Sequence, residues 1–311
     1  MKATGVECFE ASRSRLASLA YRLLGSATDA EDTVQDAFLR WQAADQTRIE
    51  IPEAWLTKVV TNLSLDRLRS AKTRRERVVG DWMPEPLLDG DPMLGPAETV
   101  EQRESVTLAV LTLLERLTPI ERAVFVLREA FSYSHAEIAD LLDITVSASQ
   151  QHAHRARRHV TARRDVGAVD AAAARRIVGA FLDAASSGRT ERLVELLTDD
   201  ATAIIDGAGW GTGLKRFSDP EQIAAVLRAG LKPTPAKRRM AGGSPAVHTA
   251  VVNGSPAMIV TVDDRVLAAM ILEIRDGRVA TVHGMAAPER IARIAREWSR
   301  REHAEPLIES W

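Results

Sequence analysis

With 311 residues, a formal net charge of −2 and one cysteine, the chain has room for two or three domains and carries no global basic field. Any nucleic-acid site must therefore be a local patch, and Cys8 alone excludes an internal disulfide and a zinc site built on paired cysteines. No run approaches the roughly 18 apolar residues of a membrane span, and the N-terminus lacks a signal-peptide core, so we expect a cytoplasmic protein without a membrane partner.

Residues 1–77 are expected to form an all-α domain. Val34, Ala37, Phe38 and Trp41 recur at helical spacing after a predicted capping box at Thr28–Glu31, and should face the core. The outer face is then acidic and amide-bearing, and holds Asp32, Gln35, Asp36 and Arg40. Such a face suits a basic partner, although a solvated acidic face gives the same pattern.

A second long helix should begin at Ile51–Glu53 and end in a basic cluster. Six Lys and Arg residues lie between Arg67 and Arg77. This cluster suits contacts with DNA phosphates, which hold register and make binding salt-sensitive without reading sequence. One basic cluster by itself is weak support for nucleic-acid binding. The polar residues expected away from the apolar face are Asn62, Asp66, Arg67 and Arg69.

Residues 78–102 contain no Lys or Arg and combine six acidic residues with four prolines. Proline removes a backbone donor and fixes the backbone, so this segment is expected to be an extended acidic linker. Trp82 within it is predicted to anchor the linker on a neighbouring domain.

Residues 103–165 carry the pattern of a helix-turn-helix. Thr118 and Ser134 can each begin a helix through a capping box, and a tight break at Asp143-Ile144 precedes a third, arginine-rich helix. This arrangement is typical of proteins that place a reading helix in the DNA major groove. An ordinary helical hairpin with a solvated basic face is the alternative.

The sequence pattern changes after about residue 168. Residues 170–295 are predicted to form an α+β domain, in which two helices (Ala171–Ser187 and Arg189–Thr198) precede a curved antiparallel sheet. Asn253-Gly254 and Asp276-Gly277 separate β-rich runs and predict two tight hairpins. Residues 296–311 form a C-terminal tail.

Three motifs, in this order, resemble those of extracytoplasmic-function (ECF) sigma factors of bacterial RNA polymerase. DAEDTVQDAFLRW (Asp29–Trp41) resembles the polymerase-binding helix of the second sigma domain, and AWLTKVVTNLSLDRLRS (Ala54–Ser70) the helix that reads the promoter −10 element. The pattern from Thr118 to Arg158 resembles the fourth sigma domain, which reads the −35 element. The resemblance implies two all-α sigma domains, at 1–77 and 103–165, with core RNA polymerase and promoter DNA as partners.

A narrower resemblance covers the remainder. WMPEP (Trp82–Pro86), DGAG (Asp206–Gly209) and NGSPA (Asn253–Ala257) are similar to markers of the ECF group that carries a fused SnoaL-like domain. That group implies a cone-shaped sheet wrapped by helices at 170–295, and control in cis through contact between this domain and the sigma domains. Trp82 is then expected to pack against the SnoaL-like domain. The residues of a regulatory pocket or interface are expected to be Trp82, Asp206, Trp210 and Asn253.

The same resemblance implies the site residues of the sigma domains. The expected polymerase-binding residues are Asp29, Glu31, Asp32, Gln35 and Asp36, and the expected −10 residues are Asn62, Asp66, Arg67 and Arg69. Glutamine can form two hydrogen bonds with adenine and serine can bond to more than one base, whereas arginine mainly contacts phosphates. The expected −35 residues are Ser147, Ser149, Gln150, Gln151, Arg155, Arg157 and Arg158.

The C-terminal domain leaves two alternatives open, a small-molecule sensor and a cyclase-like or isomerase-like enzyme. Asp206, Trp210, His248 and His283 could face a pocket, where a carboxylate can act as a general base. Asp206-Gly207 also fits a simple turn and both histidines fit structural roles, so we expect no enzyme activity, no metal and no cofactor. A plain helix-turn-helix repressor is disfavoured, because that class does not need the Asp29–Trp41 motif.

Overall fold

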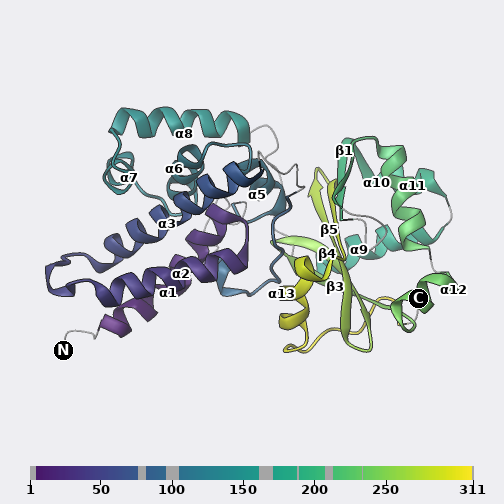
Figure 1. Ribbon diagram of the computed structural model, residues 1–311. Helices are drawn as coiled ribbons and strands as arrows, with labels where there is room; N and C mark the ends of the chain where they lie inside the picture. Colours follow the sequence, from purple (N-terminus) through teal and green to yellow (C-terminus); the bar gives the residue numbers. More distant parts are fainter. Residues whose placement is uncertain are drawn as a thin grey trace. The chain divides into compact units, whose positions relative to one another are not determined.

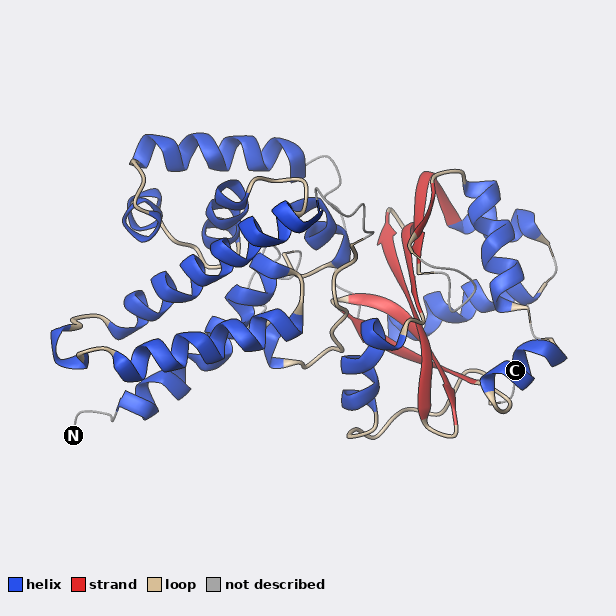
Figure 2. Ribbon diagram, viewed as in Figure 1, coloured by secondary structure: helices blue, strands red, loops and turns tan. Residues whose placement is uncertain are grey.

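The computed structural model describes residues 5–75, 82–95, 105–160, 171–187, 189–206, 213–232 and 234–309. The chain divides into two compact units. The first comprises Met1–Glu85 and Gly90–Arg164, and the second comprises Pro86–Asp89 and Asp165–Trp311. All the strands that the structure describes lie in the second unit, as Figures 1 and 2 show. In the described ranges, no helix is both long enough and apolar enough to cross a membrane.

The first unit begins with three long helices, α1 (Gly5–Leu24), α2 (Ala27–Ala43) and α3 (Pro52–Arg75), with the short turn η1 (Gln46–Arg48) between the last two. The predicted inward positions Val34, Ala37 and Trp41 are buried. The predicted capping box at Thr28 is wrong: the cap is Ser26 and α2 begins two residues earlier than predicted, at Ala27, because Ser26 Oγ accepts the Asp29 N–H at 3.1 Å. The helix start therefore has a hydroxyl cap, as helix N-termini commonly do.

In the described range 105–160, the first unit contains four further helices: α5 (Leu108–Leu114), α6 (Pro119–Glu129), α7 (His135–Leu142) and α8 (Val146–Val160). Capping boxes at Thr118 with Glu121 and at Ser134 with Glu137 begin α6 and α7, as predicted. Asp143 ends α7 in the left-handed region, with φ of 53°, so that the chain turns within a few residues into α8. The helix-turn-helix geometry thus follows directly from the caps.

The linker segment described in the structure, residues 82–95, is mostly extended and contains one short turn, η2 (Pro92–Leu94). Arg22 of α1 is buried and holds this segment, since its guanidinium donates to the Leu94 carbonyl at 2.9 Å and to Ser105 Oγ at 2.9 Å. Burial lowers the pKa of Arg22 to about 10. Nothing in the local sequence pattern distinguishes Arg22 from a surface arginine.

The second unit is α+β, as predicted. Its six-stranded sheet has the order β2-β1-β6-β5-β4-β3, and β1 runs parallel to β6 while the other neighbours are antiparallel. The strands are β1 (Leu197–Ile205), β2 (Lys215–Phe217), β3 (Ala246–Val252), β4 (Ser255–Val262), β5 (Arg265–Arg275) and β6 (Arg278–Met285). The helices are α9 (Ala171–Ser186), α10 (Thr190–Leu196), α11 (Pro220–Leu231), α12 (Pro235–Ala241) and α13 (Pro288–Trp298).

Both predicted hairpins form. Asn253 and Gly254 join β3 to β4 with φ of 51° and 77°, and Asp276 and Gly277 join β5 to β6 with φ of 52° and 76°. Two successive left-handed residues match the twist of paired strands, which is why Asn-Gly and Asp-Gly favour such turns. The second predicted helix is too long, because α10 ends at Leu196 and the chain then enters β1.

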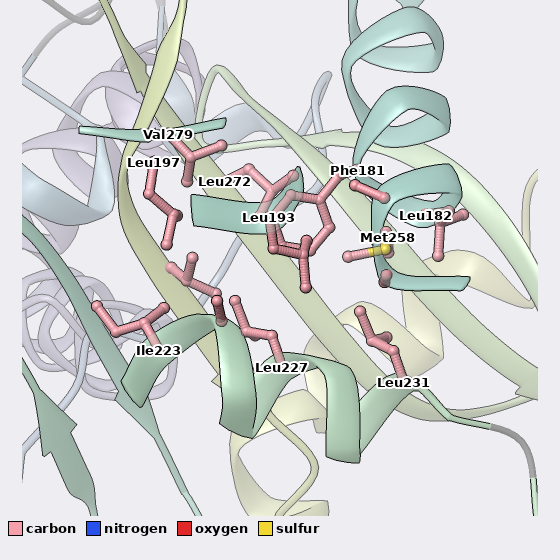
Figure 3. Packing of buried hydrophobic residues seen from close by; sticks show 14 of the residues in the cluster. Phe181, Leu182, Leu193, Leu197, Ile223, Leu227, Leu231, Met258, Leu272 and Val279 are labelled. Atoms are coloured by element: carbon pink, nitrogen blue, oxygen red, sulfur yellow. The ribbon is translucent and has the colours of Figure 1, made fainter. Parts of the chain in front are cut away.

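Helices α9, α10 and α11 cover one face of the sheet and form the core of the second unit with it. Phe181 and Leu182 of α9, Leu193 of α10 and Leu227 of α11 meet sheet residues such as Leu272 (Figure 3). All five residues are buried, so the apolar faces of the helices and of the sheet contribute to the same apolar cluster.

Candidate functional site

The outer face of α2 combines acidic, amide and apolar side chains. Glu31, Asp32 and Gln35 are exposed, and Leu39, one turn further along, is 55% exposed. Sequence reasoning did not single out Leu39. The sequence does contain the information: Leu39 follows Asp32 by seven residues and Asp36 by three, and this spacing puts it on the same helix face as these acidic residues.

Arg67 of α3 lies against this acidic face. Its guanidinium is 2.8 Å from Asp36 Oδ2, 3.8 Å from Asp29 Oδ1 and 4.0 Å from Asp32 Oδ2. The structure therefore brings three of the expected polymerase-binding residues together with one of the expected −10 residues. The Arg67 side chain therefore lies on the side of α3 that contacts α2, and the other expected −10 residues lie on a different face of α3.

The other expected −10 residues share a second face of α3. Asn62, Asp66 and Arg69 follow the spacing i, i+4 and i+7, and Asp66 and Arg69 are exposed while Asn62 is half-buried. Arg69 pairs with Asp66 at 3.1 Å. The basic cluster beyond Arg69 falls on residues whose side chains lie outside the described part of the chain.

On α8, the expected −35 residues divide into an outer and an inner set. Ser147, Gln150, Gln151 and Arg158 are exposed, whereas Ser149 is fully buried and bonds through Oγ to His135 Nδ1 at 2.9 Å. The expectation that Ser149 approaches a base edge is wrong, because its side chain ties α8 to α7. The outer face also includes His154, which sequence reasoning did not assign to base reading.

Two expected phosphate clamps on α8 are held by acids of α6. Arg157 donates to Glu129 Oε1 at 2.7 and 3.0 Å, and Arg155 lies 3.4 Å from Glu121. Although partial burial raises it, the pKa of Glu121 lies below its usual value because of hydrogen bonds with Thr118 and the charges of Arg155 and His152. Glu121 therefore stays ionised and orients Arg155. Arg158 makes no ion pair with any residue that the structure describes.

Asp206 and Asn253 both have buried backbone partners in the second unit. The Asp206 carboxylate accepts the N–H groups of Ala286 and Ala287 at 2.8–3.0 Å, at the start of α13. Asn253 Oδ1 accepts the Leu87 N–H at 2.8 Å, and its own N–H donates to the Leu87 carbonyl at 2.9 Å. Asn253 thus holds the linker residues Pro86–Asp89, which belong to this unit.

Trp82 packs within the first unit, and its expected contact with the C-terminal domain stays a prediction. The indole ring lies where a Cβ on Gly25 would be, so Trp82 packs on the turn between α1 and α2 in the first unit. Close by, Glu85 Oε2 accepts the N–H groups of Ala27 at 2.7 Å and Thr28 at 3.1 Å, at the positive end of the α2 dipole. Trp210 lies outside the described residues.

The two histidines of the enzyme alternative have different partners. His283 is fully buried and lies 3.4 Å from the buried Glu273, whereas His248 packs edge-on against Trp298 at 5.3 Å. Asp206 bonds through its carboxylate to the start of α13, and its own N–H donates to the carbonyl of Gly284, the residue after His283. Across the described residues, no three His, Cys, Asp or Glu side chains form a group that could hold a metal ion.

Comparison with known proteins agrees with this arrangement of helices. Residues 8–74 match the family model for Sigma-70 region 2, and residues 107–160 match that for Sigma-70, region 4. The ECF RNA polymerase sigma factor SigJ of Mycobacterium tuberculosis is 38% identical over 291 residues, 91% of each chain. The probable ECF RNA polymerase sigma factor SigI of the same species is 32% identical over 285 residues, 90% of this chain and 92% of SigI.

The similarity extends to the fold of the whole chain. The crystal structure of the M. tuberculosis extracytoplasmic function sigma factor SigJ superposes with a TM-score of 0.68 at 33% sequence identity, and covers 92% of this chain and 98% of SigJ. Both the helical unit and the α+β unit are therefore common to the two proteins. The chain belongs to the ECF family of RNA polymerase sigma factors, which bind core polymerase and promoter DNA to direct transcription initiation.

Proposed function

We propose that this sigma factor contacts its partners through three helical faces, and that its α+β unit regulates it in cis. The face of α2 with Asp32, Gln35 and Leu39 binds core polymerase, and the face of α3 with Asn62, Asp66 and Arg69 meets the −10 strand. The outer face of α8 meets the −35 duplex. Arg158, which is exposed at the arginine-rich end of α8 and makes no ion pair within the described ranges, carries the −35 part of this proposal.

Arg158 allows a direct test of the phosphate contact. Phosphate contacts carry no sequence information, so a DNA duplex of any sequence serves for this measurement. Arg158→Ala is expected to weaken binding and to lower the slope of log K against log salt by about 0.9, the release expected for one phosphate contact. Arg116→Ala, which removes another exposed arginine outside α8, is the matched control and should leave the slope unchanged. An unchanged slope for Arg158→Ala contradicts the role.

The linker supports regulation in cis. Trp82 and Glu85 hold it at the start of α2 in the first unit, and Asn253 holds Leu87 in the second unit. A change at the β3–β4 hairpin of the second unit can therefore alter the linker next to the helix proposed to bind polymerase. Intramolecular regulation of this kind needs no separate inhibitory protein.

Two hairpins of similar geometry provide a matched pair for this test. Asn253→Gly removes the side chain that holds Leu87 while glycine keeps the left-handed turn, and Asp276→Gly makes the same change in the other hairpin. We expect Asn253→Gly in the full chain to change the Kd for core polymerase at least threefold, and Asp276→Gly to leave it unchanged. Equal effects of the two variants, or none, contradict regulation through this contact.

A further inference from the structure

The second unit contains a partly open cavity of about 290 Å³. Its walls come from α11, α12 and the face of the sheet that packs against the helices. Met258 pairs with Met270 and Val260 with Ala268 on neighbouring strands, and these four residues line the cavity from one sheet face because alternate residues point the same way. Val226 and Leu231 of α11 form the opposite wall.

This cavity is continuous with the core of the unit. Leu227, Leu231 and Met258 belong both to the core cluster and to the cavity wall (Figure 3). Protein interiors are close-packed and contain few voids larger than a water molecule. An apolar void of about 150 Å³ already stays dry and takes up benzene, so a cavity of this volume has room for a larger apolar molecule.

The charged residues near the cavity serve the fold. The Lys237 ammonium donates to the carbonyls of Ala229, Gly230 and Lys232, and so uses its three donors to close the C-terminus of α11. The Asp206 carboxylate accepts backbone N–H groups at the start of α13. The wall surface is almost entirely apolar, so the exposed Lys232 and Arg238 contribute mainly their aliphatic stems.

We propose that this cavity binds an uncharged, predominantly apolar small molecule with the bulk of two or three fused or linked rings. The apolar wall supplies affinity by burying hydrophobic surface. Among the described residues that line the cavity, the exposed surface is almost entirely apolar, which disfavours anions and cations because they would lose their hydration without compensation. The site goes beyond the proposed sigma-factor function and does not depend on it, because all its walls belong to the second unit.

The test uses the full chain and two dyes with the same ring skeleton. N-phenyl-1-naphthylamine is uncharged and fluoresces in apolar sites, and 8-anilinonaphthalene-1-sulfonate adds one sulfonate to that skeleton. We expect the uncharged dye to bind saturably at one site and to raise the Tm by a few degrees at saturation. The sulfonate is expected to bind at least tenfold more weakly.

Substitutions that fill the cavity tie the signal to this site. Ala268→Trp fills it from the sheet and Val226→Trp from α11, and each is expected to weaken binding of the uncharged dye at least tenfold. Two positions on opposite walls keep the test valid if one variant fails to fold. Met240→Ala is the matched control, since Met240 is 65% exposed on α12 and does not line the cavity; this variant should bind like the parent.

Any one of three results overturns the proposal. The first is that the uncharged dye does not bind the parent chain saturably. The second is that the folded cavity-filling variants bind this dye as tightly as the parent does, and the third is that the sulfonate binds as tightly as the uncharged dye. The first two remove the site, and the third removes the assigned ligand class. None of these results bears on polymerase or DNA binding, so failure here is distinguishable from failure of the proposed function.

Discussion

Replacing Arg67 with glutamine separates the two roles that this residue could have. In the structure, Arg67 lies between 2.8 and 4.0 Å from Asp36, Asp29 and Asp32, on the helix face proposed to bind core polymerase. A basic partner that takes these carboxylates must displace Arg67. A −10 DNA contact would instead require Arg67 to leave them for a nucleotide.

The size of the effect follows from the exposure of the pairs. The Arg67 side chain is 32% exposed and that of Asp36 46% exposed, so solvent screens their attraction. Ion pairs of this kind contribute about 0.2–1 kcal/mol. We therefore expect Arg67→Gln to lower the free energy of unfolding by about 0.5–1 kcal/mol, and to strengthen core binding by about two- to fivefold, since the partner no longer competes with this cation.

Urea unfolding and titration of labelled protein with M. tuberculosis core polymerase measure the two quantities. The gain in core affinity should shrink as salt is raised, because exposed charges are screened. Asp36→Asn in the same background completes a double-mutant cycle and isolates the coupling of this pair. If Arg67→Gln weakens core binding, or leaves it unchanged while reducing −10 complexes, the competition argument is wrong and Arg67 acts on DNA.

Two further predictions concern the apolar part of the α2 face and the pH dependence of the helix-turn-helix. Leu39→Ser should weaken core binding about tenfold, because it removes roughly 1.4 kcal/mol of apolar burial. The control is Ile51→Ser, at a residue that is 65% exposed and lies outside α2, and it should change core affinity less than twofold. Similar effects at both positions would refute an interface at Leu39. Burial, together with the charges of Arg128 and Arg157, lowers the pKa of His135 in the folded protein below 6.5, so folding disfavours the protonated imidazole. The contribution of neutral His135 to the free energy of unfolding is therefore complete above pH 6.5 and is lost as the pH falls through the lower folded pKa. His135→Gln should therefore flatten the pH dependence of the urea midpoint below pH 6.5, and a slope equal to the parent's would contradict this assignment.

Sequence reasoning succeeded where one local rule determines the geometry. The capping boxes at Thr118 and Ser134 fix the starts of α6 and α7, and the Asn253-Gly254 and Asp276-Gly277 turns fix two hairpins. Each depends on residues at most three positions apart, so a single sequence contains all the information needed. The family resemblance then supplied the order of the domains, and the comparisons confirm the family.

The contacts that sequence reasoning missed join residues that are distant in the sequence. Ser149 looked like a base reader, but His135 of the preceding helix turns its hydroxyl inward. The place of Trp82 also depends on a distant residue, because Gly25 has no side chain and leaves room for the indole ring at the turn between α1 and α2. Helical periodicity indicates whether a position is on an apolar face, but it does not identify the residue that lies across from it.

In a chain with a net charge of −2, the same long-range pairing also sets the partners of several arginines. Arg67 pairs with acids of α2, and Arg155 and Arg157 pair with Glu121 and Glu129 of α6. These arginines are thereby held in defined positions before a partner binds, which reduces the entropy lost on binding. The cost is that each must exchange its carboxylate for a phosphate or leave the pair. With the phosphate contacts proposed for α8, affinity for DNA depends on the acids of α6 as well as on the arginines of α8, and the number of arginines alone overestimates it.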